Sequence, residues 1–166
     1  DGSDIQEFKA NYGSSILCGF ARIGGNEIGI LANRGVLFAD SADKAAHFIN
    51  LCCQRDVPLL FLADVTGFMV GRQSEQRGIA RAGAKMFTAM ASASVPKYTI
   101  IVGGSYGAGY LSMAGRAFKP TAMFSWPNGR AAIMGPDQAA TTLALVQQKI
   151  RARDGLDAWT PDEVEE

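Results

Sequence analysis

The segment that most constrains the fold is residues 97–113, KYTIIVGGSYGAGYLSM, where an apolar strand pattern runs directly into a glycine-rich turn and a helix pattern. A glycine-rich turn lets a ligand approach the backbone closely, and the first N–H groups of a helix have no partner within the helix. Such a turn can hold an oxyanion. The segment therefore predicts an α/β fold with an anion site at the carboxyl end of one strand.

Apolar patterns upstream of this segment alternate between strands and helices. We predict a β-hairpin, a helix with one buried face, a covered strand, a second helix, and then the strand that enters the glycine-rich turn. In order, these are residues 14–23 and 27–32, residues 41–55, residues 59–65, a helix that Ser74 caps and that ends before Pro96, and residues 98–102. The alternation predicts a largely parallel sheet with right-handed crossovers.

Downstream of the glycine-rich turn the predicted elements are shorter. Residues 121–126 and 130–134 are strand candidates on either side of a Pro-Asn-Gly turn, and a helix with an apolar stripe begins at Pro136. From residue 151 the chain becomes polar and acidic, which predicts a solvated tail. The length of 166 residues fits a single domain.

Composition argues against several classes of function. Lysine plus arginine and aspartate plus glutamate each number 16, so the charge balance favours neither nucleic acid nor an anionic membrane as a partner. The 3 cysteines, two of them adjacent, indicate neither a disulfide framework nor a metal site, and they favour a reducing compartment. No apolar run approaches the roughly 20 residues of a membrane span. The chain does not begin with methionine, so we expect an excised segment.

Two loops leave the carboxyl ends of predicted strands, residues 66–71 (TGFMVG) and residues 105–109 (SYGAG). Ligands of open α/β sheets bind at this end of the strands. If the two strands are neighbours, both loops can face one site. Tyr106 and Tyr110 flank the glycines of the second loop, where they either stack on a flat ligand or pack in an ordinary core.

A serine hydrolase is one hypothesis for this turn, because residues 103–107 fit the Gly-x-Ser-x-Gly pattern of a nucleophile elbow. Ser105 would then need a base, and the single histidine, His47, falls on the polar face of its predicted helix. A solvated His47 and a small Ser105 in a crowded turn are therefore favoured. For Asp64, which ends an apolar strand, we favour accepting loop N–H bonds over proton transfer.

Catalysis by backbone donors is the second hypothesis. An enzyme can stabilise an enolate with two convergent N–H groups, and losing one such donor costs on the order of 3 kcal/mol. No side-chain base is then required of this chain.

Ten segments, in chain order, are similar to the carboxyltransferase β subunits of biotin-dependent acyl-CoA carboxylases. They are DGS (1–3), EFK (7–9), GILAN (29–33), HFI (47–49), CCQR (52–55), GFMVG (67–71), ARAGAKM (80–86), VPK (95–97), SYGAG (105–109) and WPN (126–128). The likeness spans about residues 1 to 150. Within that family, GFMVG and CCQR most resemble the methylcrotonyl-CoA type.

The resemblance implies a crotonase-like fold, a spiral of repeated β-β-α units. It also implies that residues 1–166 form the carboxyl-terminal half of such a subunit, which receives carboxybiotin, while an absent amino-terminal half holds the acyl-CoA. Expected partners are that half, the biotin carboxylase and biotin carrier subunit, the acyl-CoA and further copies of the chain. The expected compartment is the bacterial cytoplasm or the mitochondrial matrix.

In that family, backbone N–H groups at the glycine-rich helix start stabilise the ureido oxygen of biotin. The resemblance places this role on Ala108 first, with Gly107 and Gly109 beside it, and a second donor in the loop of Phe68 and Met69. The residues we assign to holding biotin are Gly67, Gly71, Ser105, Tyr106 and Tyr110.

The mechanism that the resemblance implies uses biotin itself as the base. Carboxybiotin releases carbon dioxide, the biotin enolate removes a proton from the acyl-CoA, and the substrate enolate attacks the carbon dioxide. A decarboxylase that runs the transfer in reverse shares these motifs. A Ser105 hydrolase on a related fold and a non-catalytic assembly module are the remaining alternatives.

Overall fold

The computed structural model describes residues 4–157, so the DGS motif at residues 1–3 and the end of the polar tail lie outside the described residues. The chain divides into two units, one ending at Ile133 and one beginning at Met134. No helix among residues 4–157 is long and apolar enough to cross a membrane. The assignment of the whole chain to one domain stays a prediction.

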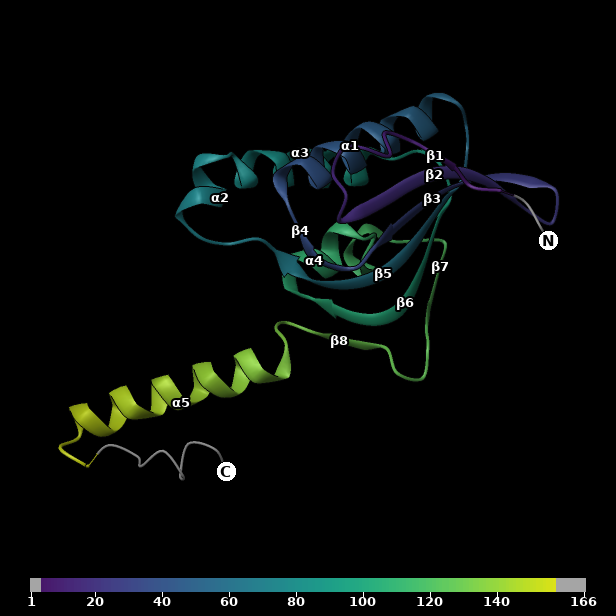
Figure 1. Ribbon diagram of the computed structural model, residues 1–166. Coiled ribbons are helices and arrows are strands. Elements are labelled where there is room, and N and C mark those ends of the chain that lie inside the picture. The colour runs from purple at the N-terminus through teal and green to yellow at the C-terminus, as the bar shows by residue number, and fades with distance from the viewer. Residues whose placement is uncertain (1–3, 158–166) are drawn as a thin grey trace. The chain divides into compact units, whose positions relative to one another are not determined.

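The first unit is built on a mixed sheet in the strand order β1-β2-β3-β5-β6-β7, with β4 paired to β5 and β8 paired to β6 (Figure 1). The strands are β1 (Gln6–Glu7), β2 (Ile16–Ile23), β3 (Asn26–Asn33), β4 (Gly35–Leu37), β5 (Leu59–Phe68), β6 (Lys97–Tyr106), β7 (Ala122–Ser125) and β8 (Arg130–Ala132). The pairs β1-β2 and β2-β3 are antiparallel, and every other pair is parallel. The predicted hairpin and parallel sheet are confirmed.

Two long helices, α1 (Ala39–Gln54) and α3 (Ile79–Ser92), lie side by side over this sheet (Figure 1). Their buried faces meet the strands in one apolar cluster, which includes Phe48, Phe61 and Met86. The shorter helices are α2 (Arg72–Gln76), α4 (Gly107–Ser112) and the 3-10 turn η1 (Arg116–Phe118). The buried faces follow the periodicity that predicted them, because apolar side chains gain most when they leave water together.

The segment between β5 and β6 differs from the sequence prediction. We expected one helix capped by Ser74, but Ser74 lies inside the short α2, and α3 begins only at Ile79. Gly78 separates the two helices with φ of 82°, a left-handed conformation that favours glycine and interrupts a helix. The predicted cap at Ser74 was wrong because the sequence pattern did not reveal that Gly78 divides this segment into two helices.

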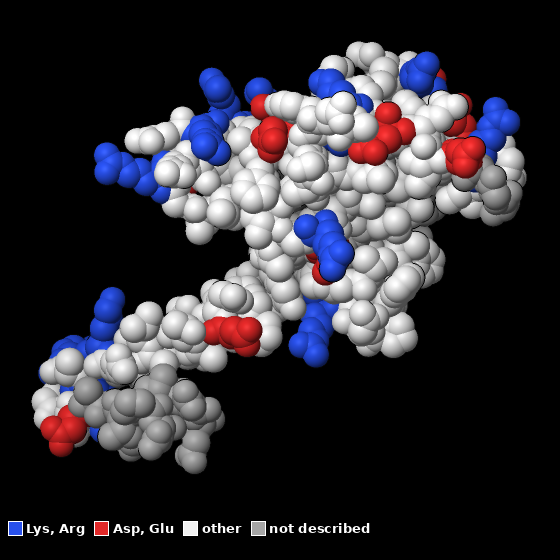
Figure 2. Space-filling model, in the orientation of Figure 1, with Lys and Arg blue, Asp and Glu red and all other residues white. Residues whose placement is uncertain are grey.

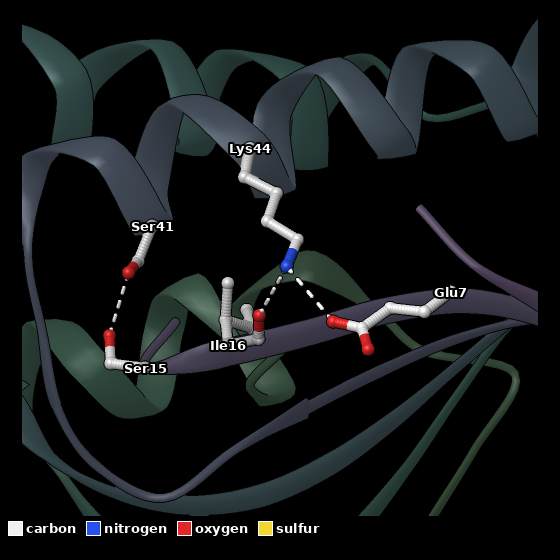
Figure 3. A network of polar contacts seen from close by, with 5 residues as sticks. All are labelled: Glu7, Ser15, Ile16, Ser41 and Lys44. Carbon is white, nitrogen blue, oxygen red and sulfur yellow. Dashed lines mark hydrogen bonds and ion pairs between the residues drawn. The ribbon is translucent and has the colours of Figure 1, made fainter. Parts of the chain in front are cut away.

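A buried lysine ties α1 to the first two strands (Figure 3). The side chain of Lys44 is fully buried, and its Nζ donates a hydrogen bond to the Ile16 carbonyl at 2.9 Å and pairs with Glu7 Oε1 at 3.4 Å. Beside it, the hydroxyls of Ser15 and Ser41 are 2.7 Å apart. Since the charge has both a carboxylate and a carbonyl partner, this network holds β1 and β2 against α1.

The second unit is described by its helix α5 (Pro136–Arg153), which begins with proline in its first turn as the sequence predicts. The predicted apolar stripe is present but exposed: Leu143 is 64% exposed, Val146 46% and Ile150 38%. Residues 151–153, assigned to the tail from sequence, still belong to the helix.

Candidate functional site

The two loops singled out from sequence begin at one edge of the sheet, because β5 and β6 are adjacent and parallel. β6 is longer than predicted and runs through Gly103, Gly104 and Ser105 to Tyr106, so the turn proper begins at Gly107. β5 also continues past its predicted end, as far as Phe68. The expectation that the strands are neighbours is confirmed.

The start of α4 lies against the end of β5. A Cβ atom added at Gly109 would be 2.5 Å from Val65 Cγ2 and 3.2 Å from the Cα of Gly67. Gly107 has φ of 53°, and a Cβ there would be 2.8 Å from the Ile133 carbonyl oxygen. Both positions therefore require glycine, because the turn packs directly against Ile133 and the end of β5.

The N-terminus of α4 has no side-chain cap among the described residues. The first N–H groups of a helix lack intrahelical partners, so those of the turn are candidate donors to a ligand. Ala108 is exposed whereas Gly109 is buried. Of the three N–H groups in the turn, that of Ala108 therefore best combines access with a lack of helical partners.

The first loop offers its donors unequally. The Met69 N–H donates to the Leu37 carbonyl at 2.8 Å and is thereby engaged with β4. Successive N–H groups of an extended strand point to opposite sides, and β6 lies on the other side of β5 from β4. The Phe68 N–H should therefore point toward the side of β6 and α4, which makes Phe68 a better donor candidate than Met69.

Ser105 lies within β6 rather than on the exposed turn. It is fully buried, and its Oγ has no hydrogen-bond partner among the described residues. His47 is on the exposed face of α1, where its Nδ1 is 3.1 Å from Lys9 Nζ. A nucleophile elbow needs an exposed serine that is bonded to its base, so this arrangement argues against a Ser105 hydrolase.

Asp64 serves the backbone of the neighbouring strand. Its Oδ1 accepts a hydrogen bond from the Gly104 N–H at 2.8 Å, and a Cβ atom at Gly103 would collide with its carboxylate. The Asp64 N–H in turn donates to Asn33 Oδ1 at 3.4 Å. The favoured prediction, a carboxylate that accepts backbone N–H bonds, is confirmed, and the position of this carboxylate explains the glycine at Gly103.

The two tyrosines differ in how much the fold occupies them. The Tyr110 hydroxyl accepts the Arg116 N–H at 2.9 Å and lies 3.8 Å from Met123 Sδ. Tyr106 is half-buried, and its ring lies over Gly104, where an added Cβ would be 2.8 Å from Tyr106 Cε2. These contacts hold the Tyr110 side chain within the fold. The roles of Gly67, Gly71, Ser105, Tyr106 and Tyr110 in binding stay predictions.

The ionisable Asp64 side chain at this edge of the sheet is engaged with the Gly104 N–H. No cluster of potential metal ligands exists among residues 4–157. Burial raises the pKa of Cys18 and of Cys52 to about 12, so both thiols stay protonated at neutral pH. Figure 2 shows acidic and basic side chains interspersed over the face of the first unit that it presents. Backbone donors are therefore the chemical resource of the site.

Gly83 lies on the buried face of α3, and the sequence pattern by itself indicates no chemistry for it. Glycine inside a helix destabilises it by about 1 kcal/mol relative to alanine. In the structure Gly83 lines an apolar cavity of about 320 Å³ that also touches Phe68. The sequence did contain a signal, which was a glycine at a core position of a helix. It could not show that the Phe68 ring lies opposite Gly83.

The fold and the match to a family model together define the class of this chain, the carboxyltransferases with a crotonase-like fold. The family model of the carboxyl transferase domain matches residues 1–166. The chain belongs to this family, and the predicted crotonase-like fold is confirmed.

Several relatives of the chain are acyl-CoA carboxylase β subunits. It is 54% identical over 165 residues to the biotin-dependent 3-methylcrotonyl-coenzyme A carboxylase β1 subunit of Mycobacterium tuberculosis, covering 99% of this chain and 31% of that protein. It is 54% identical over 155 residues to the probable mitochondrial methylcrotonoyl-CoA carboxylase β chain of Drosophila melanogaster, covering 93% and 27%.

Solved structures of acyl-CoA carboxylase and transcarboxylase subunits also match this chain. The β subunit of geranyl-CoA carboxylase from P. aeruginosa matches with a TM-score of 0.84 and 46% identity, covering 88% of this chain and 28% of that one. The hexameric transcarboxylase 12S matches with a TM-score of 0.81 and 41% identity, covering 84% and 29%. The chain thus spans about a third or less of each relative's length.

Proposed function

We propose that this chain is the biotin-side half of a carboxyltransferase that moves a carboxyl group between carboxybiotin and the enolate of an acyl-CoA. The single observation that carries the proposal is the exposed, uncapped turn at Ala108 beside the end of β5. Similarity along the whole chain to biotin-dependent carboxylase subunits supports the same conclusion.

The turn suits the ureido group of biotin on electrostatic grounds. Gly107 and Gly109 let it pack directly against Ile133 and the end of β5, and this close packing fixes its backbone N–H groups. The Ala108 N–H from α4 and the Phe68 N–H from β5 are the two donors we assign to the ureido oxygen. Donors fixed by the fold need no reorganisation when charge develops, which is the main source of their catalytic effect.

The chemistry asked of the chain's own residues is limited. Carboxybiotin supplies the carboxyl group and the proton acceptor when it is bound. The chain orients the ureido ring and stabilises negative charge on its oxygen. No general base is needed, which agrees with the burial of Ser105 and the bonding of Asp64 to Gly104.

For the substrate we propose a branched or unsaturated acyl-CoA, on the strength of the methylcrotonyl-CoA carboxylase names of two relatives. The amino-terminal half of the subunit would hold its coenzyme A, and a biotin carrier would deliver the carboxyl group. We propose the bacterial cytoplasm or the mitochondrial matrix as the compartment. One relative comes from a bacterium, and the name of another describes it as mitochondrial.

Association with further protein is supported by α5, on which Leu143, Val146 and Ile150 lie on one face and are all exposed. Exposed apolar side chains that lie together on a helix are typical of an interface. We propose that α5 packs against the rest of the subunit or another copy of it. A monodisperse monomer of the full-length subunit in light scattering, together with full activity, would exclude the intermolecular form of this contact.

The decisive experiment measures carboxyl transfer by mass spectrometry, from carboxylated acyl-CoAs to free biotin. It uses the full-length subunit that contains this chain, with the Ala108→Pro variant as the control. Transfer that depends on the Ala108 N–H supports both the reaction class and the site. No transfer by a correctly assembled subunit would overturn the proposal.

A further inference from the structure

The sheet of the first unit is interrupted at one level, just before the edge that carries the two assigned donors. β5 pairs with β3 as far as Leu62 and with β4 from Val65 onward. β6 makes the corresponding change, because it pairs with β7 as far as Ile101 and with β8 from Gly104 onward. Both strands therefore exchange their outer partners at the same level of the sheet.

The ladder between β5 and β6 is broken at this level as well. The register shifts between Ala63 and Val65, so that a single residue of β5 faces three residues of β6. These are Asp64 and residues 102–104. Extra residues in one strand form a bulge, in which backbone groups lose their ladder partners. Because an unpaired backbone group away from water is costly, these groups need partners of another kind.

Three side chains, which we call the bridging side chains, supply such partners. Asn33 Oδ1, at the end of β3, accepts the Asp64 N–H at 3.4 Å. The Asp64 carboxylate accepts the Gly104 N–H at 2.8 Å. Asn128, in the segment between β7 and β8, donates from Nδ2 to the Val102 carbonyl at 3.2 Å. The bridging side chains Asn33, Asp64 and Asn128 therefore form a row across the interrupted sheet.

Two of the bridging side chains are held in place by their surroundings. A Cβ atom at Gly103 would collide with the Asp64 carboxylate, so the bulge closes tightly around this group. Asn33 is only 6% exposed, and its Nδ2 also donates to the Gly35 carbonyl at 3.4 Å. A side chain confined in this way can fix the backbone groups to which it is bonded.

Both assigned donors lie beyond the row of bridging side chains. β5 runs on from Asp64 to Phe68. β6 runs on from Gly104 to Tyr106, where the turn that contains Ala108 begins. The bond between Asp64 and Gly104 therefore fixes how far β6 is advanced along β5 at the point where the ladder resumes. A shift of β6 along β5 would move the Ala108 N–H relative to the Phe68 N–H.

We infer that the three bridging side chains are positioning residues for carboxyl transfer. Through the backbone of β5 and β6, they set the place of the Ala108 N–H relative to the Phe68 N–H. The inference rests on the proposed function, which assigns both N–H groups to one ureido oxygen. Two donors stabilise one oxygen only when both lie within hydrogen-bond reach of it, so a small displacement of either lowers the rate.

The test uses the full-length subunit with the variants Asp64→Ala, Asp64→Asn and Asn128→Ala. Asp64→Ala removes the acceptor of the Gly104 N–H, whereas Asp64→Asn keeps an oxygen that can accept it. Asn26→Ala is the matched control for Asn128→Ala. Asn26 Nδ2 also donates to a backbone carbonyl, that of Gly24 at 3.3 Å, but it does so in the hairpin turn between β2 and β3.

Carboxyl transfer to free biotin and amide hydrogen exchange at Gly104 are measured for each variant. Asp64→Ala should lower kcat about tenfold and leave KM for the acyl-CoA within about twofold, because the donors shift while the acyl-CoA is held elsewhere. Asp64→Asn should restore kcat to within about threefold of the unmodified subunit. Asn128→Ala should lower kcat about threefold, and Asn26→Ala should leave it unchanged. Exchange at Gly104 should be faster in Asp64→Ala only.

A double variant separates positioning from a general loss of structure. In Ala108→Pro the donor N–H is already absent, so a residue that acts by placing this N–H has little left to affect. Adding Asp64→Ala to Ala108→Pro should therefore lower kcat by less than about threefold. A further tenfold loss would show that Asp64 acts independently of the turn and would overturn the inference.

The remaining outcomes distinguish this inference from the proposed function. Unchanged kcat in Asp64→Ala, with transfer that still depends on the Ala108 N–H, would overturn the inference and leave the proposed function standing. Absence of transfer by the unmodified subunit, with faster exchange at Gly104 in Asp64→Ala, would refute the proposed function and support the bridging role. If Asp64→Ala does not fold, Asn128→Ala decides, since an unchanged kcat in that variant would overturn the inference.

Discussion

The first unit treats polar groups in opposite ways at two places. Around Lys44, the buried charge, the Ile16 carbonyl and Glu7 satisfy one another, and the hydroxyls of Ser15 and Ser41 do the same beside them. At the carboxyl end of β5 and β6, the α4 turn is uncapped and Ala108 is exposed. The first region uses its polar groups to hold elements together, and the second leaves donors available.

This difference separates stability from function within one small fold. A buried charge that has lost its partner is costly, so the Lys44 network should respond to substitution through the free energy of unfolding. Donors that face solvent cost little when unused. Substitution at the Ala108 turn should therefore act on the rate and leave stability largely intact.

The sharpest way to break the comparison is Ala108→Pro. Proline removes the donor N–H, so we expect kcat for carboxyl transfer to fall about 100-fold or more. Ala108→Gly keeps the N–H and should change kcat by less than about tenfold. Steady-state kinetics and thermal unfolding are measured together. Equal kinetic losses in both variants would show that the N–H at this position is not the catalytic group.

Lys44→Ala tests the other region. It leaves the Ile16 carbonyl and Glu7 without their partner and should cost about 3 kcal/mol of unfolding free energy, measured by denaturant titration. Lys85→Ala is the matched control, because Lys85 pairs with Asp43 at 2.9 Å on the surface. That exposed pair should contribute at most about 1 kcal/mol. If both variants lost the same free energy, the buried network would not be the stabilising region.

Alkaline pH provides a milder test of the buried side of the sheet. Burial raises the pKa of the Cys18 and Cys52 thiols from the usual 9.0 to about 12. Between these values the unfolded chain loses protons that the folded chain keeps. The unfolding free energy should therefore be unaffected by these thiols below about pH 9 and fall as the pH rises toward 12.

Chemical labelling checks the same thiols independently. At pH 8, iodoacetamide should leave Cys18 and Cys52 unmodified in the folded protein and modify them in denaturant, as read by peptide mass spectrometry. Rapid labelling of either thiol under native conditions would contradict the burial on which this expectation depends.

Ser105→Ala should have the smallest effect. The Ser105 hydroxyl is buried and has no hydrogen-bond partner within residues 4–157, so its removal should be neutral or slightly stabilising. Carboxyl transfer should stay within about twofold of the unmodified subunit, because the backbone donors are retained. Loss of activity in this variant, at unchanged stability, would revive the hydrolase hypothesis and place the active group in β6.

Local pattern predicted much of the fold because it records which faces must be buried. The hairpin of β2 and β3, the helix α1 and the parallel pair β5-β6 all follow from apolar periodicity and turn residues. The prediction that the loops after β5 and β6 begin at one edge also needed only the order of strands. The predicted ends of the elements were less accurate. Gly103 and Gly104 were assigned to a turn, but they belong to β6, where the Gly104 N–H donates to Asp64.

Several properties depended on contacts between segments far apart in the chain. Burial of Lys44 needs Glu7 and Ile16 beside it, and the engagement of the Met69 N–H needs the Leu37 carbonyl. A sequence pattern shows neither, because such partners are brought together only by the sheet register. The cavity at Gly83 likewise depends on a distant segment of the chain, because the Phe68 ring of β5 lies opposite Gly83.

The sequence by itself thus determined the class of fold, the family and the glycine-rich turn, because burial periodicity, glycine positions and motif order are local properties of the chain. Only the tertiary structure decided which N–H groups are engaged, that Ser105 is buried, and that Gly83 faces an apolar cavity. These depend on which groups become neighbours when the strands align, and hydrogen bonding and exclusion of water act only between neighbours.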